Sequence, residues 1–147
     1  MRYILCFLCF LSSGCGLIAP IMGSVHSAGF TAGDRKALLP EELKKYNTAL
    51  YWGSADEALS LVLPEGREAV VAQLRKSREK ERLVESKVNF VDYDADGYTA
   101  KVEVEYKFYK IPVYIVTERR EKQEWKFTLS DGWKLLSTAP AENTKTS

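Results

Sequence analysis

Cysteine and histidine are almost absent from this 147-residue sequence. The three cysteines, Cys6, Cys9 and Cys15, all lie in the first fifteen residues, and His26 is the only histidine. From residue 27 onward there is no thiol to act as a nucleophile or form a disulfide, and no imidazole to bind metal or transfer protons. This excludes serine–histidine and cysteine–histidine catalytic pairs from that region, as well as zinc sites made of cysteine and histidine.

Long hydrophobic runs and an excess of one charge are also missing. The longest apolar stretch near the N-terminus, residues 3–11, is far shorter than the about 20 residues that span a bilayer. Removing residues 1–14 takes away Arg2 and no acid, so the remainder carries 20 basic and 20 acidic residues. Because no basic excess is left to neutralise phosphates, nucleic-acid binding is not expected.

The first residues do contain an export signal. Arg2, the apolar stretch and the small residues 12–14 lead directly to Cys15. This layout resembles a bacterial lipoprotein signal, with Ser12 at the place where leucine is most common. The resemblance implies cleavage after residue 14, lipid on the Cys15 thiol and an N-acyl chain such as palmitate, which together give stable membrane attachment. An uncleaved anchor running on to residue 19 is the alternative, although Pro20 and residues 12–14 interrupt it.

The rest of the chain divides into three parts. Residues 15–37 are rich in glycine, alanine and serine and are predicted to form a lipidated, flexible tether. Residues 38–138 are enough for one domain, and residues 139–147 form a polar tail. Gly16, where the sorting rule of enteric bacteria would place aspartate for inner-membrane retention, favours the outer membrane. We therefore expect a location in the bacterial cell envelope, on the outer membrane and facing the periplasm.

Three helices are predicted at the start of the domain. The apolar residues of the first recur at helical spacing: Leu39, Leu43, Tyr46 and Leu50. Pro40 suits the first turn of this helix, and Gly53 suits its end. A short helix over residues 56–63 and a third over residues 67–82 follow.

Beyond residue 83 the hydrophobic period changes from 3.6 to 2, which indicates strands. Val84, Val88 and Phe90 are expected to share one face of the first strand. Alternate residues of the second are expected to face the core: Tyr98, Ala100, Val102, Val104, Tyr106 and Phe108. A third strand over residues 113–129 and a fourth over residues 133–136 complete an antiparallel sheet. The fold class is α+β, with N-terminal helices packed on a curved antiparallel sheet.

This order of elements resembles the NTF2-like fold, also described as the ketosteroid isomerase-like or cystatin-like cone. The segments that carry the resemblance are Tyr51-Trp52-Gly53, residues 55–67, residues 94–108, Glu124-Trp125-Lys126-Phe127 and Gly132-Trp133-Lys134-Leu135. The family contains isomerases, dehydratases, transport factors and non-catalytic partner domains, so the fold alone implies no activity. The resemblance also implies a homodimer formed by face-to-face pairing of two sheets.

An acidic hairpin offers the sharpest local motif. Asp92, Asp94, Asp96, Gly97 and Glu103 fit the spacing D-x-D-x-D-G-x5-E of a calcium-binding loop. Such a loop needs a helix on each side, whereas here both flanks alternate as strands. We interpret the segment as a hairpin turn and expect no metal, with weak calcium binding through the three aspartates as the alternative.

Candidates for catalysis are few. If Trp125 and Phe127 face the core without a bulge between, then Glu121 and Arg119 share their face, and Glu121 becomes a candidate general base. Tyr106 on the neighbouring strand is the second candidate. The alternative is that the third strand overhangs the core, or that a bulge turns Glu121 to solvent. No cofactor is expected.

An aromatic pair marks a candidate surface. Tyr109 and Tyr114 flank Pro112 between two predicted strands, where a ligand or partner protein could contact them. The leading hypothesis is a lipid-anchored, non-catalytic envelope protein that binds a partner protein or a small apolar ligand. The alternative is a lyase- or isomerase-type enzyme with its site in the cone. A third hypothesis is a structural envelope role that depends on the tether.

Overall fold

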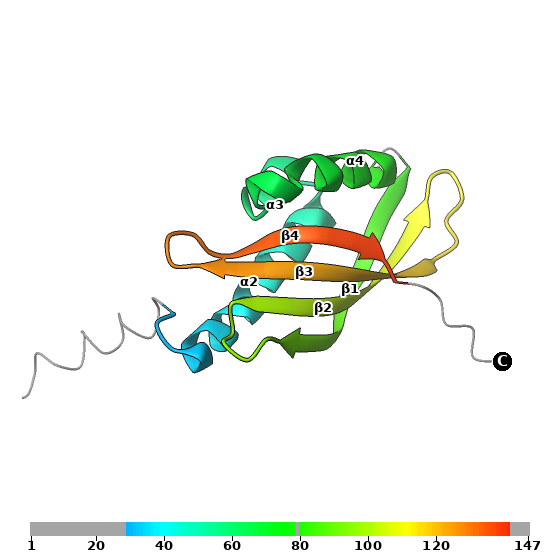
Figure 1. Ribbon diagram of the computed structural model, residues 1–147. Helices are drawn as coiled ribbons and strands as arrows, with labels where there is room; N and C mark the ends of the chain where they lie inside the picture. Colours follow the sequence, from blue (N-terminus) through cyan, green and yellow to red (C-terminus); the bar gives the residue numbers. More distant parts are fainter. Residues whose placement is uncertain (1–28, 79, 142–147) are drawn as a thin grey trace, which may run out of the picture.

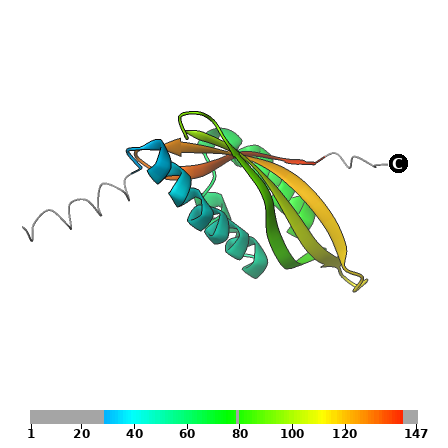
Figure 2. The same cartoon turned by 90° about the horizontal axis from the view of Figure 1, so that it is seen from below.

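The computed structural model describes residues 29–78 and 80–141, which form a helical layer packed on one sheet (Figure 1). The helices are α2 (Ala32–Trp52), α3 (Ala55–Ser60) and α4 (Arg67–Arg78), with a 3₁₀ turn at Pro64–Gly66 before α4. The strands are β1 (Glu81–Tyr93), β2 (Thr99–Lys110), β3 (Thr117–Thr128) and β4 (Gly132–Pro140), paired antiparallel in the order β1-β2-β3-β4. The sheet curves around the helices, as the view from below shows (Figure 2).

Helix α2 begins earlier than the sequence suggested. Thr31 caps it, with its hydroxyl accepting from the Asp34 N–H while the Asp34 carboxylate accepts from the Thr31 N–H, which is a complete capping box. Residues 32–37, expected in the tether, are therefore helical, and Pro40 lies inside the helix instead of in its first turn. Proline leaves the carbonyl four residues earlier without its usual donor. The Tyr93 hydroxyl donates to that carbonyl, on Lys36, at 3.1 Å.

The regular alternation of β1 is broken twice. Register shifts occur between Leu83 and Glu85 and between Val88 and Phe90. Val88 consequently pairs with buried Val104 on the inner face, while Phe90 pairs with Glu103 on the outer face and is 61% exposed. The expectation that Val88 and Phe90 share a face is therefore wrong, because bulges cannot be read from the hydrophobic pattern. On β2 the predicted inward face is confirmed for five residues, since Ala100, Val102, Val104, Tyr106 and Phe108 are buried. The sixth, Tyr98, was predicted wrongly, because it lies in the turn before β2 and is 40% exposed.

The connection between β2 and β3 is longer than predicted. Residues 111–116 form a loop instead of the start of a strand, and β3 begins only at Thr117. Five of the six loop residues are apolar and exposed: Ile111, Val113, Tyr114, Ile115 and Val116. The loop (yellow in Figure 1) projects from the end of the sheet opposite to the start of α2. Its apolar run resembled a strand in the sequence because hydrophobicity was the only guide.

The core lies between α2 and the concave face of the sheet. Tyr46 packs edge-to-face on Trp125 with ring centroids 5.8 Å apart, and Phe127 packs in the same way on Trp133 at 5.6 Å. Gly66 sits where an added Cβ would lie 1.8 Å from the Leu136 carbonyl oxygen, so only glycine lets the turn before α4 approach β4 this closely. Within the described ranges, no helix is long and apolar enough to cross a membrane.

Candidate functional site

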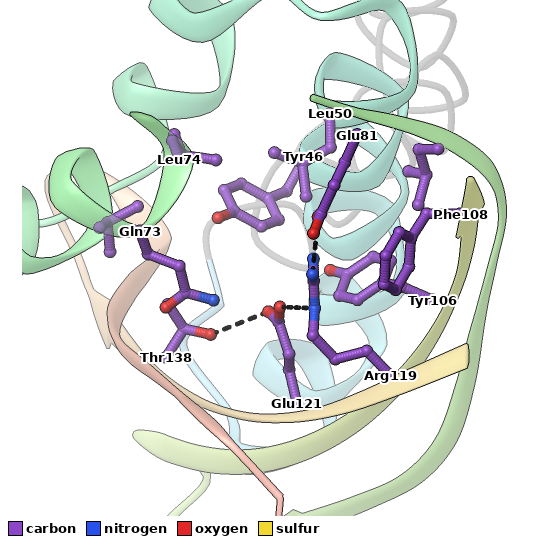
Figure 3. Close-up of a pocket in the computed structure, with 12 residues that line it drawn as sticks. Tyr46, Leu50, Gln73, Leu74, Glu81, Tyr106, Phe108, Arg119, Glu121 and Thr138 are labelled. Carbon is purple, nitrogen blue, oxygen red and sulfur yellow. Dashed lines mark hydrogen bonds and ion pairs between the residues drawn. The ribbon is translucent and has the colours of Figure 1, made fainter. Parts of the chain in front are cut away.

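A small cavity opens between α4, the end of α2 and the concave face of the sheet (Figure 3). Its volume is about 80 Å³, well below the about 300–1,000 Å³ of pockets that enclose drug-sized ligands. One part of the wall is apolar: Leu50, Val70, Leu74, Leu83 and Phe108. The other part is polar: Tyr46, Gln73, Glu81, Tyr106, Arg119, Glu121 and Thr138. The cavity therefore suits a small molecule that has both an apolar and a polar part.

The alternation of β3 carries Glu121 into this cavity. Glu121, Gln123, Trp125 and Phe127 are all buried, with no irregularity between them in the pairing of β3 with β2. Glu121 thus lies on the inward face of β3, together with Trp125 and Phe127, as expected for a strand without a bulge between them. The side chain is 5% exposed, and its Oε2 accepts a hydrogen bond of 3.1 Å from the Thr138 hydroxyl on β4.

Arg119 lies between two carboxylates. Its NH1 donates to Glu81 Oε2 on β1 at 2.7 Å, and its Nε lies 2.7 Å from Glu121 Oε1 at an ion-pair distance, although its N–H is not aligned for a hydrogen bond. The guanidinium also stacks over the Phe108 ring, 4.7 Å from the centroid. Burial alone would lower the pKa of Arg119, but the hydrogen bond to Glu81 and the charge of Glu121 outweigh it and raise the pKa above its ordinary value. The arginine is therefore a permanent cation in the cavity wall.

Tyr106 lines the cavity with its ring but uses its hydroxyl elsewhere. The hydroxyl donates to Asn47 Oδ1 at 2.8 Å and accepts from Gln123 Nε2 at 2.9 Å. Gln123 Oε1 in turn accepts from the Trp125 indole N–H at 3.1 Å. Burial first, and then the charge of Glu121, raise the pKa of Tyr106 well above its usual range. Both functions of this hydroxyl are already used in a buried network that fixes α2 on the sheet.

Tyr46 stands on the opposite wall, on α2. Its ring is almost fully buried, and its hydroxyl points toward the space that Gln73 and Thr138 face (Figure 3). Burial raises the pKa of Tyr46 above its usual range, and the negative charge of Glu121 raises it further. The influence of Glu121 on Tyr46 means that both groups belong to one electrostatic site.

This pKa shift predicts how stability depends on alkaline pH. The unfolded chain loses the Tyr46 proton near pH 10, whereas the folded chain keeps it, so the contribution of Tyr46 to stability is intact below pH 10 and falls above it. Above pH 10 we expect the unfolding free energy of the wild-type protein to fall with pH more steeply than that of Tyr46→Phe, by about 1.4 kcal/mol per pH unit. Urea unfolding between pH 9 and 11.5 measures this, with Tyr51→Phe on the exposed side of α2 as the control. Equal slopes in all three proteins would contradict the placement of Tyr46.

The three aspartates of the acidic hairpin do not gather around a common point. The Asp94 carboxylate accepts from the Tyr98 N–H at 2.8 Å and closes the turn, and the Asp96 carbonyl accepts from the Arg35 guanidinium. Asp92 lies in β1 opposite Lys101. Among residues 29–78 and 80–141, no cluster of three or more histidine, cysteine, aspartate or glutamate side chains is arranged to hold a metal ion. The carboxylate of Asp94 thus has a structural role in closing the turn.

The aromatic pair lies outside the cavity. The rings of Tyr109, at the end of β2, and Tyr114, in the 111–116 loop, lie 5.4 Å apart between centroids and are tilted by 39°, and Tyr114 is 73% exposed. They remain a predicted contact surface, separate from the site around Glu121. Cys15 and the signal lie outside the described residues.

Several residues of the cavity were not predicted as site residues. Tyr46 was expected only as an apolar residue of a helix face, and Thr138 was assigned to the end of the domain. Glu81 was placed in the helix over residues 67–82, but that helix ends at Arg78 and Glu81 begins β1. The alternation of β3 was a sufficient signal for Glu121, whereas Glu81 reaches the cavity only through the pairing of β1 with β2, which local sequence does not specify.

Comparison with known proteins identifies the fold from solved structures. No family model matches the sequence, and no curated protein matches it. An NTF2-like protein from Cytophaga hutchinsonii ATCC 33406 is 15% identical, with a TM-score of 0.55 over 72% of this chain and 96% of that one. A ketosteroid isomerase-like protein from Erwinia carotovora atroseptica SCRI1043 is 10% identical, with a TM-score of 0.56 over 72% and 95%. The chain has the NTF2-like fold.

A third structure agrees with this fold. A protein of unknown function with a cystatin-like fold, from Nostoc punctiforme PCC 73102, is 10% identical, with a TM-score of 0.53 over 71% of this chain and 88% of that one. In each case the matched region has the size of the domain described here. The cavity around Glu121 thus lies inside an NTF2-like cone, while identities of 10–15% carry no statement about activity.

Proposed function

We propose that this protein is a lipid-anchored protein of the bacterial cell envelope whose NTF2-like domain binds a small molecule in its cone without transforming it. The observation that carries the proposal is the cavity beside Glu121, which combines an apolar wall with a buried carboxylate. A pocket of this composition orients a ligand by a few polar contacts and gains affinity from its apolar wall.

The environment of Glu121 favours binding over catalysis. A general base must accept a proton from its substrate and release it again. In Glu121 one oxygen lies at an ion-pair distance from Arg119 and the other accepts from Thr138, so the carboxylate is already held by protein partners in a poorly solvated place. Tyr106, the second catalytic candidate, has a hydroxyl already bonded on both sides. Glu121 serves better as a fixed charge than as a proton carrier.

The alternative is a lyase- or isomerase-type enzyme in which Glu121 is the base. The observation in its favour is the shared cavity of Glu121 and Tyr46, where a carboxylate and a phenol face the same space. Proton abstraction can be followed as deuterium incorporation at the α-carbon of a small ketone such as cyclopent-2-enone, observed by NMR in D₂O. Exchange that is faster than in buffer and is lost in Glu121→Gln would support the enzyme and contradict the binding function. We expect the buffer rate.

Lipid attachment through Cys15 is tested directly by substitution. In a bacterial host we expect the wild-type chain to fractionate with membranes and to incorporate labelled palmitate, and the Cys15→Ser variant to incorporate none and to keep residues 1–14, because a serine hydroxyl does not accept the lipid. Mass spectrometry of the membrane-extracted protein is expected to show an N-terminal acylated cysteine and no residues 1–14. A chain that retains Met1 and an unmodified Cys15 would refute the anchor. Cys9→Ser is the control and leaves fractionation unchanged.

A further inference from the structure

The cavity contains more acid than base. Glu81 and Glu121 both face Arg119, so two negative charges share one guanidinium inside the cone. Among the described residues Lys110 also pairs with Glu81, with its Nζ 3.8 Å from Glu81 Oε1, but the lysine side chain is 60% exposed and its charge is screened by solvent. Glu121, at 6% side-chain exposure, is far less solvated than Lys110. The inner part of the cavity therefore has a negative potential.

The polar groups of the inner wall also present hydrogen-bond acceptors to the cavity. Each carboxylate oxygen of Glu121 has two lone-pair sites; the Thr138 hydroxyl uses one on Oε2, and Oε1 faces Arg119 Nε without an aligned hydrogen bond. The Tyr46 hydroxyl oxygen faces the same space and can accept as well as donate. Two acceptors, one of them anionic, suit a group with several N–H donors and a positive charge. An anion would instead face the net charge of Glu81, Arg119 and Glu121.

The apolar wall of the cavity determines which apolar group the ligand can carry. Leu50, Leu74 and Leu83 line the cavity beyond Tyr46, and the Phe108 ring is already covered on one face by Arg119. A short unbranched alkyl chain would lie along these leucines. The volume of about 80 Å³ suits a ligand much smaller than a drug-sized molecule.

We infer that the ligand of the cone is a small primary ammonium compound with a short apolar chain. Its ammonium group is bound by the Glu121 carboxylate and the Tyr46 hydroxyl, and its chain lies against Leu50 and Leu74. This inference rests on the proposed binding function and specifies the ligand class of that site. Arg119 takes no direct part: it pairs with both Glu81 and Glu121, and its single positive charge leaves one of their two negative charges for the ligand.

Three probes of equal chain length separate charge from shape. n-Butylamine is cationic at pH 7, n-butanol is neutral and butyrate is anionic. Each is titrated into the ¹⁵N-labelled chain carrying Cys15→Ser, and dissociation constants are taken from amide shifts on β3 and β4 near Glu121 and Thr138. We expect n-butylamine to bind at least tenfold more tightly than n-butanol, and butyrate to bind most weakly.

Two variants assign the preference to Glu121. In Glu121→Gln the tenfold preference for n-butylamine is expected to disappear while n-butanol binding is retained. Glu118→Gln, which removes an exposed acid from the same strand, is expected to keep the preference. If Glu121→Gln does not fold, the wild-type order of the three probes decides the inference alone, since only a local negative potential puts the cation first and the anion last.

The outcomes are distinguishable. If n-butanol or butyrate binds at the cone as tightly as n-butylamine, the ammonium inference is overturned and the binding function stands. If none of the three shifts a cone amide at millimolar concentration, the inference and the binding function both fail. A preference for n-butylamine that persists in Glu121→Gln would also overturn the inference, because the cation would then be held elsewhere.

Discussion

Replacing Arg119 with methionine is expected to destabilise the fold by about 2–4 kcal/mol. Methionine keeps much of the apolar bulk against Phe108 but leaves Glu81 and Glu121 facing each other without a cation. Removing one partner of a buried ion pair costs about 3–5 kcal/mol, and the 30% exposure of the Arg119 side chain brings this site toward the lower end. Urea unfolding at pH 7 measures the loss.

A matched control lies next along the strand. Arg120 also pairs with a glutamate, Glu105, at 3.0 Å, but it is 58% exposed on the outer face. Arg120→Met is therefore expected to cost under about 1 kcal/mol. Equal losses in the two variants would contradict a buried charge cluster.

Replacing Arg35 with methionine is expected to cost about 3–4 kcal/mol. The Arg35 side chain is 5% exposed and donates to four backbone carbonyls, those of Gly29, Phe30, Asp96 and Gly97. It also lies over the Tyr98 ring at 4.0 Å from the centroid. A carbonyl left without a donor in a buried place costs about 1–3 kcal/mol, and some of these four can regain water. The arginine therefore holds the first turn of α2 on the β1–β2 hairpin.

The measurement for Arg35 is again the free energy of unfolding. Lys44→Met on the exposed side of α2 is the control and is expected to change stability by less than about 0.5 kcal/mol. If Arg35→Met is as mild as the control, then residues 29–37 contribute as a tether and not as part of the domain, as their composition had suggested.

The structural role of Arg35 could not be predicted from the sequence. The strong periods of β2 and of α2 from Leu39 onward predicted the class, the order of elements and the inward face of β2. Composition alone assigned residues 15–37 to a tether, because the two hydrogen bonds that tie Arg35 to the sheet go to carbonyls 61 and 62 residues away and leave no local pattern. The capping box at Thr31 was a readable signal for the true start of α2.

The sequence pattern predicts one of the two glutamates of the candidate site and not the other. Glu121 follows from alternation along β3, which is regular where it pairs with β2. Glu81 does not follow, since it comes directly after a charged helix and its face depends on a register with two bulges. The presence of a cavity could not be predicted either, because it is the space left between α4 and β3 once their side chains have packed.

The central claim is that a small molecule binds inside the cone beside Glu121, and intermolecular nuclear Overhauser effects test it most directly. The protein, carrying Cys15→Ser, is labelled at its leucine, valine and isoleucine methyl groups and saturated with n-butylamine. The account predicts contacts from the ligand methylene protons to the methyl groups of Leu50 and Leu74 on the cavity wall. Contacts confined to Ile111, Val113 and Ile115 on the exposed loop would contradict it.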